Sequence, residues 1–221
     1  MTRLFMCLIT MLAACVPSDA PQDTPDAPAP ETTPAPARQQ VILFVGTSLT
    51  AGYGLTPEEA FPAVIQAQLD SAGLPYIAVN AGVSGASSAE GLARIGWLLR
   101  QPVDVLFLEL GANDGLRGTS VEAMVSNLQA IIDSTRAQNP NVRVVIAGME
   151  APPNLGGTYT EAFRRAFRDL ATRNDAALIP FLLEGVAGVD SLNQADGIHP
   201  TEDGHRIVAE TVWRILQKTL S

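Results

Sequence analysis

The stretch that decides the fold is Val41-Ile-Leu-Phe-Val45-Gly46-Thr47-Ser48, an apolar run of five residues that stops at a glycine. An unbroken apolar run of this length is typical of a strand buried on both faces of a parallel sheet. Gly46 allows the backbone to turn sharply after such a strand. We therefore predict that the first strand begins at Val41 and that Ser48 stands on an exposed strand-to-helix turn.

Similar apolar runs alternate with helix-like segments along the rest of the chain. The further expected strands are 76–79, 103–108, 142–147 and 177–179, and the expected helices are 57–70, 88–100, 120–138, 160–172 and 201–219. The first of these helices is expected to begin at Pro57, with Thr56 as its N-cap. The alternation predicts the α/β fold class: a three-layer α/β/α sandwich with a flavodoxin-like, parallel five-stranded sheet. Ligands bind beyond the carboxyl ends of the strands in such sheets.

The first 15 residues have the layout of a secretory signal. Thr2-Arg3 is a small positive region, residues 4–12 are apolar, and Leu12-Ala13-Ala14-Cys15 closes the segment. The apolar part is too short to span a bilayer as a stable helix. The ending resembles a bacterial lipoprotein signal, which implies a signal peptide at 1–14 and a lipidated Cys15 as the mature N-terminus. The alternative is an ordinary signal peptide that is cleaved near an accidental cysteine.

Residues 16–39 are rich in Pro, Ala, Thr, Asp and Gln and show no apolar periodicity. Such a composition cannot bury enough apolar surface to fold, and proline favours extended forms. At roughly 3 Å per residue, the segment reaches up to about 70 Å. We predict a disordered tether, the alternative being a disordered segment without a role. The predicted hydrolase domain follows at 40–221, a length that suits one domain.

Charge and cysteine content exclude several classes of function. The chain has 14 Lys and Arg against 23 Asp and Glu, a net charge of −9, and no basic run, so nucleic acid is a disfavoured partner. Its two cysteines are Cys7, inside the predicted signal, and Cys15, at the predicted cleavage point. The predicted domain therefore has no disulfide, no thiolate metal site and no cysteine nucleophile.

Asp196-Gly-Ile-His199-Pro200 supplies the candidate base, because the chain contains only two histidines. A carboxylate three residues before a histidine can accept from one imidazole nitrogen and leave the other to face Ser48. The second histidine, His205, lies on the expected last helix, and we interpret it as a helix-face residue. A metal site built from Asp196, His199 and His205 lacks a further histidine or cysteine to complete it, so we expect no metal.

Two glycine-containing turns offer candidate oxyanion donors. Gly85 follows the second expected strand, where its amide can approach a ligand closely, although an ordinary turn is the alternative. Asn113 follows the third strand and presents a side-chain NH2, although it could equally cap a helix. The loop at Ser48 could also be a plain turn or a phosphate cradle, but it lacks the Gly-Lys-Ser/Thr of a P-loop. Thr50 also replaces the second glycine of Gly-x-Ser-x-Gly.

Taken in order, these blocks resemble the SGNH (GDSL-type) hydrolase superfamily over 41–219. The chain is most similar to the group of bacterial arylesterases and acyl-CoA thioesterase I/lysophospholipases. The matching segments are 50–54 (TAGYG), 91–94 (GLAR), 110–118 (LGANDGLRG), 154–156 (NLG) and 196–200 (DGIHP). The resemblance implies a catalytic serine nucleophile and triad at Ser48, Asp196 and His199, an oxyanion hole at Ser48, Gly85 and Asn113, and no cofactor.

One position departs from the family pattern. The block usually reads Gly-Asp-Ser-Leu, and this chain has Thr47 where the aspartate stands. Threonine can supply a shorter, neutral hydrogen-bonding support for the turn. We expect a functional but altered turn, the alternative being a weak or inactive enzyme.

The resemblance predicts a serine esterase that cleaves aryl or short- to medium-chain acyl esters without a cofactor, with thioesters and lysophospholipids as further candidate substrates. Its partners would be a small ester and, through Cys15, a membrane, with no nucleic acid and no obligate protein partner. We expect an extracytoplasmic lipoprotein, with Val16 after the cysteine favouring the outer membrane, or alternatively a secreted or periplasmic soluble protein. Residues 149–159 are expected to form a flap. The alternatives from other classes are a non-catalytic binding lipoprotein and a flavodoxin-like nucleotide binder.

Overall fold

The computed structural model describes residues 38–220, and they contain one parallel sheet of five strands. The strands are β1 (Gln40–Gly46), β2 (Tyr76–Gly82), β3 (Val105–Glu109), β4 (Arg143–Ala147) and β5 (Ala177–Ile179), in the order β2-β1-β3-β4-β5. Every neighbouring pair is parallel, which confirms the predicted α/β class and the flavodoxin-like order. The predicted signal peptide and almost all of the predicted tether lie outside the described residues.

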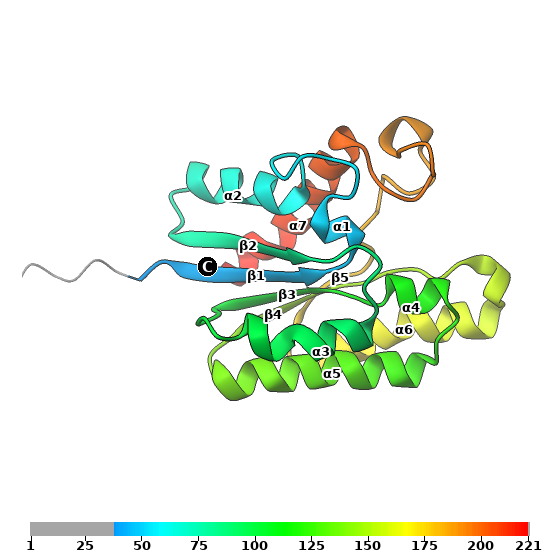
Figure 1. The fold of residues 1–221 in the computed structure, drawn as a ribbon, viewed down its shortest axis with the longest axis horizontal. Coiled ribbons are helices and arrows are strands. Elements are labelled where there is room, and N and C mark those ends of the chain that lie inside the picture. Colours follow the sequence, from blue (N-terminus) through cyan, green and yellow to red (C-terminus); the bar gives the residue numbers. More distant parts are fainter. Residues whose placement is uncertain (1–37, 221) are drawn as a thin grey trace, which may run out of the picture. The chain divides into compact units, whose positions relative to one another are not determined.

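Helices cover both faces of the sheet, as Figure 1 shows. On one face lie α2 (Phe61–Ser71) and α7 (Glu202–Leu220); on the other lie α3 (Ser88–Leu98), α5 (Val121–Gln138) and α6 (Gly157–Arg173). Short helices α1 (Ser48–Ala51) and α4 (Ala112–Leu116) follow β1 and β3, and single 3-10 turns occupy Pro153–Leu155 and Asp190–Leu192. Among the described residues, no helix combines the length and apolar character needed to cross a membrane.

A cluster of aromatic rings joins the sheet to α2. The Phe44 and Phe107 ring centroids are 4.8 Å apart on neighbouring strands, and the Phe61 ring lies 5.8 Å from Phe44 and 5.9 Å from Phe107. All three side chains are completely buried. Burying a phenylalanine side chain typically contributes about 1.5–3 kcal/mol, and aromatic pairs add to this. This cluster holds α2 against strands β1 and β3 of the sheet.

The predicted start of the first helix, at Pro57, is wrong. Helix α2 begins at Phe61, after a series of turns, with Ala60 as its N-cap. Pro62 is the physical reason. It has no N–H and its ring clashes with the carbonyl four residues earlier, so a helix running from Pro57 would carry a proline in its interior. Beginning at Phe61 places Pro62 in the first turn, where the missing N–H costs nothing.

Strand β2 is more exposed than its apolar sequence indicates. Its outer positions Ile77 and Val79 are each 38% exposed, although the run was expected to be buried on both faces. β2 is the edge strand, and α2 packs on one of its faces. On the other face, a groove remains between β2 and the end of α3, where Trp97 is also exposed. An apolar run alone therefore does not distinguish an edge strand from a central one.

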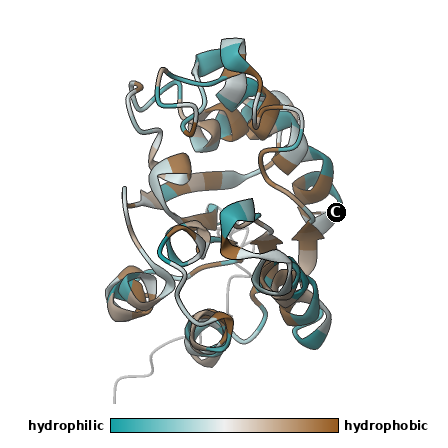
Figure 2. Cartoon of the chain, turned by 90° about the vertical axis from the view of Figure 1, so that its right-hand side faces the viewer, coloured by the Kyte–Doolittle hydropathy of each residue, from teal (hydrophilic) through white to brown (hydrophobic). Residues whose placement is uncertain are grey.

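The register of the sheet brings distant chain segments together at its carboxyl edge. Gly46, the last residue of β1, pairs with Gly82 of β2 on one side and with Glu109 of β3 on the other. The loops that follow these strands contain the predicted site residues Ser48, Gly85 and Asn113. Figure 2 views the domain from this edge, with those loops toward the viewer.

Candidate active site

A serine, a histidine and an aspartate form one hydrogen-bonded chain beyond the carboxyl ends of the strands. The Ser48 Oγ atom lies 2.9 Å from Nε2 of His199, and Nδ1 of His199 lies 2.6 Å from Oδ2 of Asp196. Ser48 and His199 are half-buried, whereas Asp196 is exposed. The structure thus brings together, in the expected order, the three residues that sequence reasoning selected as a triad.

The turn that carries Ser48 is a short helix start. Thr47 is the N-cap of α1, with an extended backbone, and its hydroxyl accepts from the Leu49 N–H at 3.4 Å. Gly52 ends the helix after one turn in the left-handed conformation, at φ +75°. Ser48 occupies the first helical position, so its own N–H belongs to the group of helix N–H donors that α-helical bonding leaves unpaired. Such a donor suits an anion that forms at this point.

The Asp196 carboxylate is held by its own turn. Its Oδ1 accepts from the backbone N–H groups of Ile198, at 2.9 Å, and His199, at 3.0 Å. These bonds, the one from the His199 backbone foremost, hold the pKa of Asp196 well below its usual range. The group therefore stays ionised at neutral pH and accepts from the His199 ring, which fixes the tautomer and aims Nε2 at Ser48.

A cavity of about 690 Å³ opens beside Ser48. Its lining includes the other two predicted oxyanion donors, Gly85 and Asn113, together with Ser48 itself. Asn113 lies in α4, and its side-chain amide donates one of its two N–H groups to the Ala86 carbonyl at 3.0 Å. Gly85 has φ +80°, a conformation that glycine adopts without strain. The three predicted donors thus share one cavity.

Most of the cavity wall is apolar. The larger apolar side chains that line it are Leu49, Leu116, Met149, Phe181, Leu183 and Ile198. Glu150 is the one carboxylate among the lining residues in the described part of the chain, and no Lys or Arg is among them. The predicted flap, 149–159, supplies five lining residues, from Met149 to Pro153. Such a wall suits an uncharged, apolar group better than an anionic one.

Sequence reasoning missed Glu109, the last residue of β3. Its side chain is completely buried and accepts hydrogen bonds from Thr47 and Thr50, the residues on either side of the Ser48 turn. Burial raises the pKa of Glu109, while the bonds from Thr47 and Thr50 oppose that shift. One signal pointed to it: an acid closing an otherwise apolar strand, which is a costly place for a carboxyl group.

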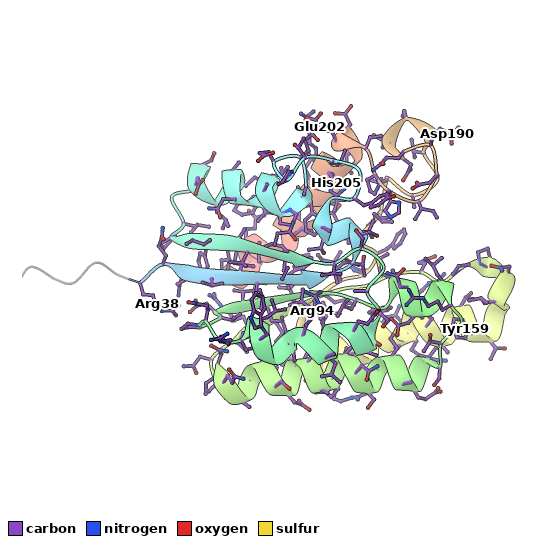
Figure 3. The ribbon with its side chains drawn as sticks, in the orientation of Figure 1. Arg38, Arg94, Tyr159, Asp190, Glu202 and His205 are labelled. Atoms are coloured by element: carbon purple, nitrogen blue, oxygen red, sulfur yellow. The ribbon has the colours of Figure 1, made fainter. Side chains whose placement is uncertain are left out.

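Arg94, the last residue of the matching segment 91–94, has a structural role that the sequence did not indicate. Its guanidinium donates to the carbonyl oxygens of Ala81, at 2.5 Å, and Gly46, at 3.1 Å. In Figure 3, Arg94 lies between α3 and the sheet. Desolvation lowers its pKa. Arg94 thus ties together the last residues of β1 and β2, from which the loops to Ser48 and Gly85 depart.

His205 lies in α7, as expected, and is buried. Its Nδ1 accepts from the Phe61 N–H at 3.1 Å, which requires the neutral ring. Desolvation, with the nearby His199 second, lowers the pKa of His205 to about 4. Within residues 38–220, no group of three or more His, Cys, Asp or Glu side chains is placed to hold a metal ion. His205 is thus a core residue rather than a second base.

A parallel sheet with a hydroxyl, an imidazole and a carboxylate aligned beyond its carboxyl ends defines the class of this protein: a hydrolase with a three-layer α/β/α fold. The chain belongs to the GDSL-like Lipase/Acylhydrolase family, whose profile matches residues 44–207. It is thus a member of the SGNH hydrolases and a carboxylic ester hydrolase.

Named relatives cover most of the chain. It is 40% identical to "Esterase TesA" of Pseudomonas aeruginosa, over 83% of this chain and 91% of that protein. It is 35% identical to "Arylesterase" of Vibrio mimicus, over 81% and 89%, and 36% identical to "Thioesterase 1/protease 1/lysophospholipase L1" of Escherichia coli, over 82% and 85%. The solved structure "Crystal Structure of TesA" superposes with a TM-score of 0.77 at 40% identity, covering 81% of this chain and 99% of that one.

Proposed function

We propose that this chain cleaves carboxylic esters through an acyl-serine intermediate on Ser48. The observation that carries the proposal is the pair of short contacts around His199: 2.9 Å from Nε2 to Ser48 Oγ and 2.6 Å from Nδ1 to Asp196 Oδ2. A serine hydroxyl becomes an effective nucleophile when an adjacent imidazole removes its proton. An imidazole can do so when a carboxylate orients it and stabilises its charged form.

In the acylation step, His199 Nε2 takes the proton of Ser48 as Oγ bonds to the ester carbonyl carbon. The carbonyl oxygen becomes an oxyanion, which accepts from the N–H groups of Ser48 and Gly85 and from the Asn113 amide. The imidazolium then gives its proton to the alcohol oxygen as the carbon–oxygen bond breaks. The alcohol leaves, and the acyl group remains on Ser48.

Deacylation repeats these events with water. His199 takes a proton from a water molecule as its oxygen bonds to the acyl carbon. The tetrahedral intermediate collapses, the proton returns to Ser48 Oγ, and the carboxylic acid leaves. Asp196 stays ionised throughout, because its backbone hydrogen bonds keep its pKa low.

The cavity indicates the substrate class. Its apolar wall and volume of about 690 Å³ suit an aryl group or a short- to medium-chain acyl group. Since no Lys or Arg lies among its described lining residues and Glu150 does, an uncharged ester is a better substrate than an anionic thioester such as an acyl-CoA. The relatives named above act as an esterase, an arylesterase and a thioesterase, and this chain's own cavity favours the first two.

Replacement of Ser48 tests the mechanism. Ser48→Ala should lower kcat for p-nitrophenyl butyrate by at least about 10,000-fold and leave the unfolding midpoint in urea close to that of the wild type. Ser126→Ala, on the exposed face of α5, is the matched control. Diethyl p-nitrophenyl phosphate should label Ser48 of the wild type, as read by peptide mass. Near-full activity of Ser48→Ala would contradict the assignment.

An acyl-chain series tests the substrate class. We expect kcat/KM for p-nitrophenyl esters to rise from acetate to butyrate or hexanoate, because each added methylene gains contact with the apolar wall, and to fall for palmitate. Butyryl-CoA should be a poorer substrate than p-nitrophenyl butyrate. A preference for the CoA thioester would contradict this part of the proposal.

The N-terminal sequence supports a location. We propose that Cys15 is lipidated and that residues 16–39 tether the enzyme to the outside of the inner membrane or to the outer membrane, which Val16 favours. Labelled palmitate should enter the wild-type protein but not Cys15→Ala, and only the wild type should partition into a detergent phase. Equal labelling of both would refute lipidation at this residue.

A further inference from the structure

A group of buried, hydrogen-bonded atoms lies behind the turn that carries Ser48. Glu109 Oε2 accepts from the Thr47 N–H at 2.8 Å, the Thr50 N–H at 3.3 Å and the Thr50 hydroxyl at 2.8 Å. The Thr47 hydroxyl lies 3.0 Å from Oε1 and 3.1 Å from Oε2. Glu109, Thr47 and Thr50 are all buried. One carboxyl group therefore holds the residue before the nucleophile and the residue two positions after it.

A buried carboxyl group is costly unless its oxygen atoms are satisfied. Here two backbone N–H groups and two hydroxyl groups satisfy it, and all four belong to the turn that carries Ser48. The reverse also holds: the N–H groups of Thr47 and Thr50 find their acceptor in Glu109. The turn and the Glu109 carboxyl group thus depend on each other, because each supplies the hydrogen-bond partners that the other needs.

Thr47 has a double role that an aspartate cannot fill in the same way. Its hydroxyl donates to Glu109 and at the same time accepts from the Leu49 N–H, as an N-cap does. An ionised aspartate at this position can accept but cannot donate. It would also place a second carboxyl group against Glu109, and two adjacent carboxyl groups are forced to share a proton. Thr47 lets a single carboxyl group hold the turn.

Gly46 provides an independent observation that this group is tightly packed. A Cβ atom built at Gly46 would lie 2.0 Å from the Thr50 hydroxyl oxygen and 2.6 Å from Glu109 Oε2. The backbone of Gly46 does not require glycine, since its φ is not positive. Glycine stands there because the hydrogen-bonded group behind the turn occupies the space of a side chain.

We propose that Glu109 is a positioning residue for catalysis, which sets the direction of the Ser48 hydroxyl through the side chains of Thr47 and Thr50. It touches no reacting atom. Ser48 lies between the two residues that it holds, so a turn freed from Glu109 can rotate the hydroxyl away from His199. This inference rests on the proposed role of Ser48 as the nucleophile.

Isosteric replacement at position 47 tests the proposal. Thr47→Val keeps the shape but removes the hydroxyl, and Thr47→Ser restores the hydroxyl without the methyl group. Because a misplacement of about 1 Å can cost 100-fold in rate, we expect Thr47→Val to lower kcat for p-nitrophenyl butyrate by about 10- to 100-fold. KM should stay within about twofold, and Thr47→Ser should recover most of the lost rate.

The matched control is Thr135→Val. Thr135 is equally buried, and its hydroxyl donates to the Ile131 carbonyl within α5, in the middle of an unrelated helix. It measures what the loss of one buried threonine hydroxyl does to stability and rate in general. Glu109→Gln is the second test, because it replaces the carboxyl group with an amide that keeps only one acceptor oxygen, and it should lower the rate of phosphorylation of Ser48 by the organophosphate as it lowers kcat.

The possible results distinguish a positioning role of Glu109 from a purely structural one. If Thr47→Val loses stability like Thr135→Val but keeps the wild-type kcat and labelling rate, Glu109 serves folding only and the proposal is overturned. If Thr47→Val does not fold, Thr50→Val gives the same comparison. Failure of the proposed function would look different, since the organophosphate would then not label Ser48 even in the wild type.

Discussion

Asp114 accepts two hydrogen bonds from Ser88: the Ser88 N–H lies 2.8 Å from Oδ2, and the Ser88 hydroxyl lies 2.6 Å from Oδ1. Both residues are buried. Ser88 opens α3, and Asp114 lies in α4 next to Asn113, a proposed oxyanion donor. The pair therefore connects α4, which carries Asn113, to α3. The direction of the Asn113 amide thus depends on a contact outside the cavity.

Asp114→Asn should cost both stability and rate. The amide keeps one acceptor for the Ser88 N–H but places an NH2 group against the Ser88 hydroxyl, which already accepts from the Asn127 amide, and losing the bond that this hydroxyl donates to Asp114 costs about 1–3 kcal/mol. Displacement of Asn113 should lower kcat by about tenfold. Urea unfolding and p-nitrophenyl butyrate kinetics measure the two effects. Asp133→Asn, at an exposed position of α5, should change neither, and an unchanged kcat in Asp114→Asn would refute the link to Asn113.

Tyr53 is predicted to hold the ring of His199. The two ring centroids are 4.5 Å apart, and Tyr53 is half-exposed at the cavity rim. Such a ring contact is worth about 0.5–1.5 kcal/mol. Tyr53→Ala should therefore lower kcat/KM by about 2- to 10-fold, whereas Tyr53→Phe, which keeps the ring, should stay close to the wild type. If Tyr53→Phe falls as far as Tyr53→Ala, the hydroxyl rather than the ring is responsible.

The parts of this structure that depend on local sequence could be predicted. Apolar runs between glycine turns predict a parallel sheet, and a parallel sheet gathers whatever follows its strands at one edge. This is why the sequence predicts a contact between Ser48 and His199, which are 151 positions apart along the chain. With only two histidines in the chain, and one of them on a helix face, few pairings were open.

The parts that depend on tertiary contacts could not be predicted. Glu109 resembles the polar end of an apolar strand, and only the register of β3 against β1 shows that it faces Gly46. Arg94 occupies an ordinary helical position, and its acceptors are main-chain carbonyls that leave no mark in the sequence. Ile77 and Val79 look buried because their strand's place at the edge of the sheet follows from topology, not from composition.

A lysine in place of Arg94 should preserve only part of the stability of the domain. The planar guanidinium of Arg94 reaches two carbonyl oxygens, those of Ala81 and Gly46, and a single ammonium group cannot match that geometry. Arg94→Met should lower the free energy of unfolding by about 1–3 kcal/mol in all, because the Gly46 carbonyl still accepts from the Val83 N–H, and Arg94→Lys should be intermediate. Arg168→Met, on the exposed side of α6, is the control. A fully stable Arg94→Lys in urea titrations would show that one donor is sufficient.

The stability of the domain should fall in mild acid because of His205. The pKa of its ring is 6.5 in the unfolded chain and about 4 in the folded protein. Between these pH values the ring is protonated in the unfolded chain but stays neutral in the folded protein. The contribution of His205 is thus present above pH 6.5 and is lost as the pH falls toward 4, about 3 kcal/mol in all.

His205→Asn keeps an acceptor for the Phe61 N–H but does not titrate. Urea unfolding at pH 7, 6, 5 and 4.5 should therefore give a flatter stability curve for His205→Asn. The raised pKa of Glu109 acts in the opposite direction but is common to both proteins, so it cancels in the difference. Parallel curves would mean that His205 does not govern the loss of stability in acid.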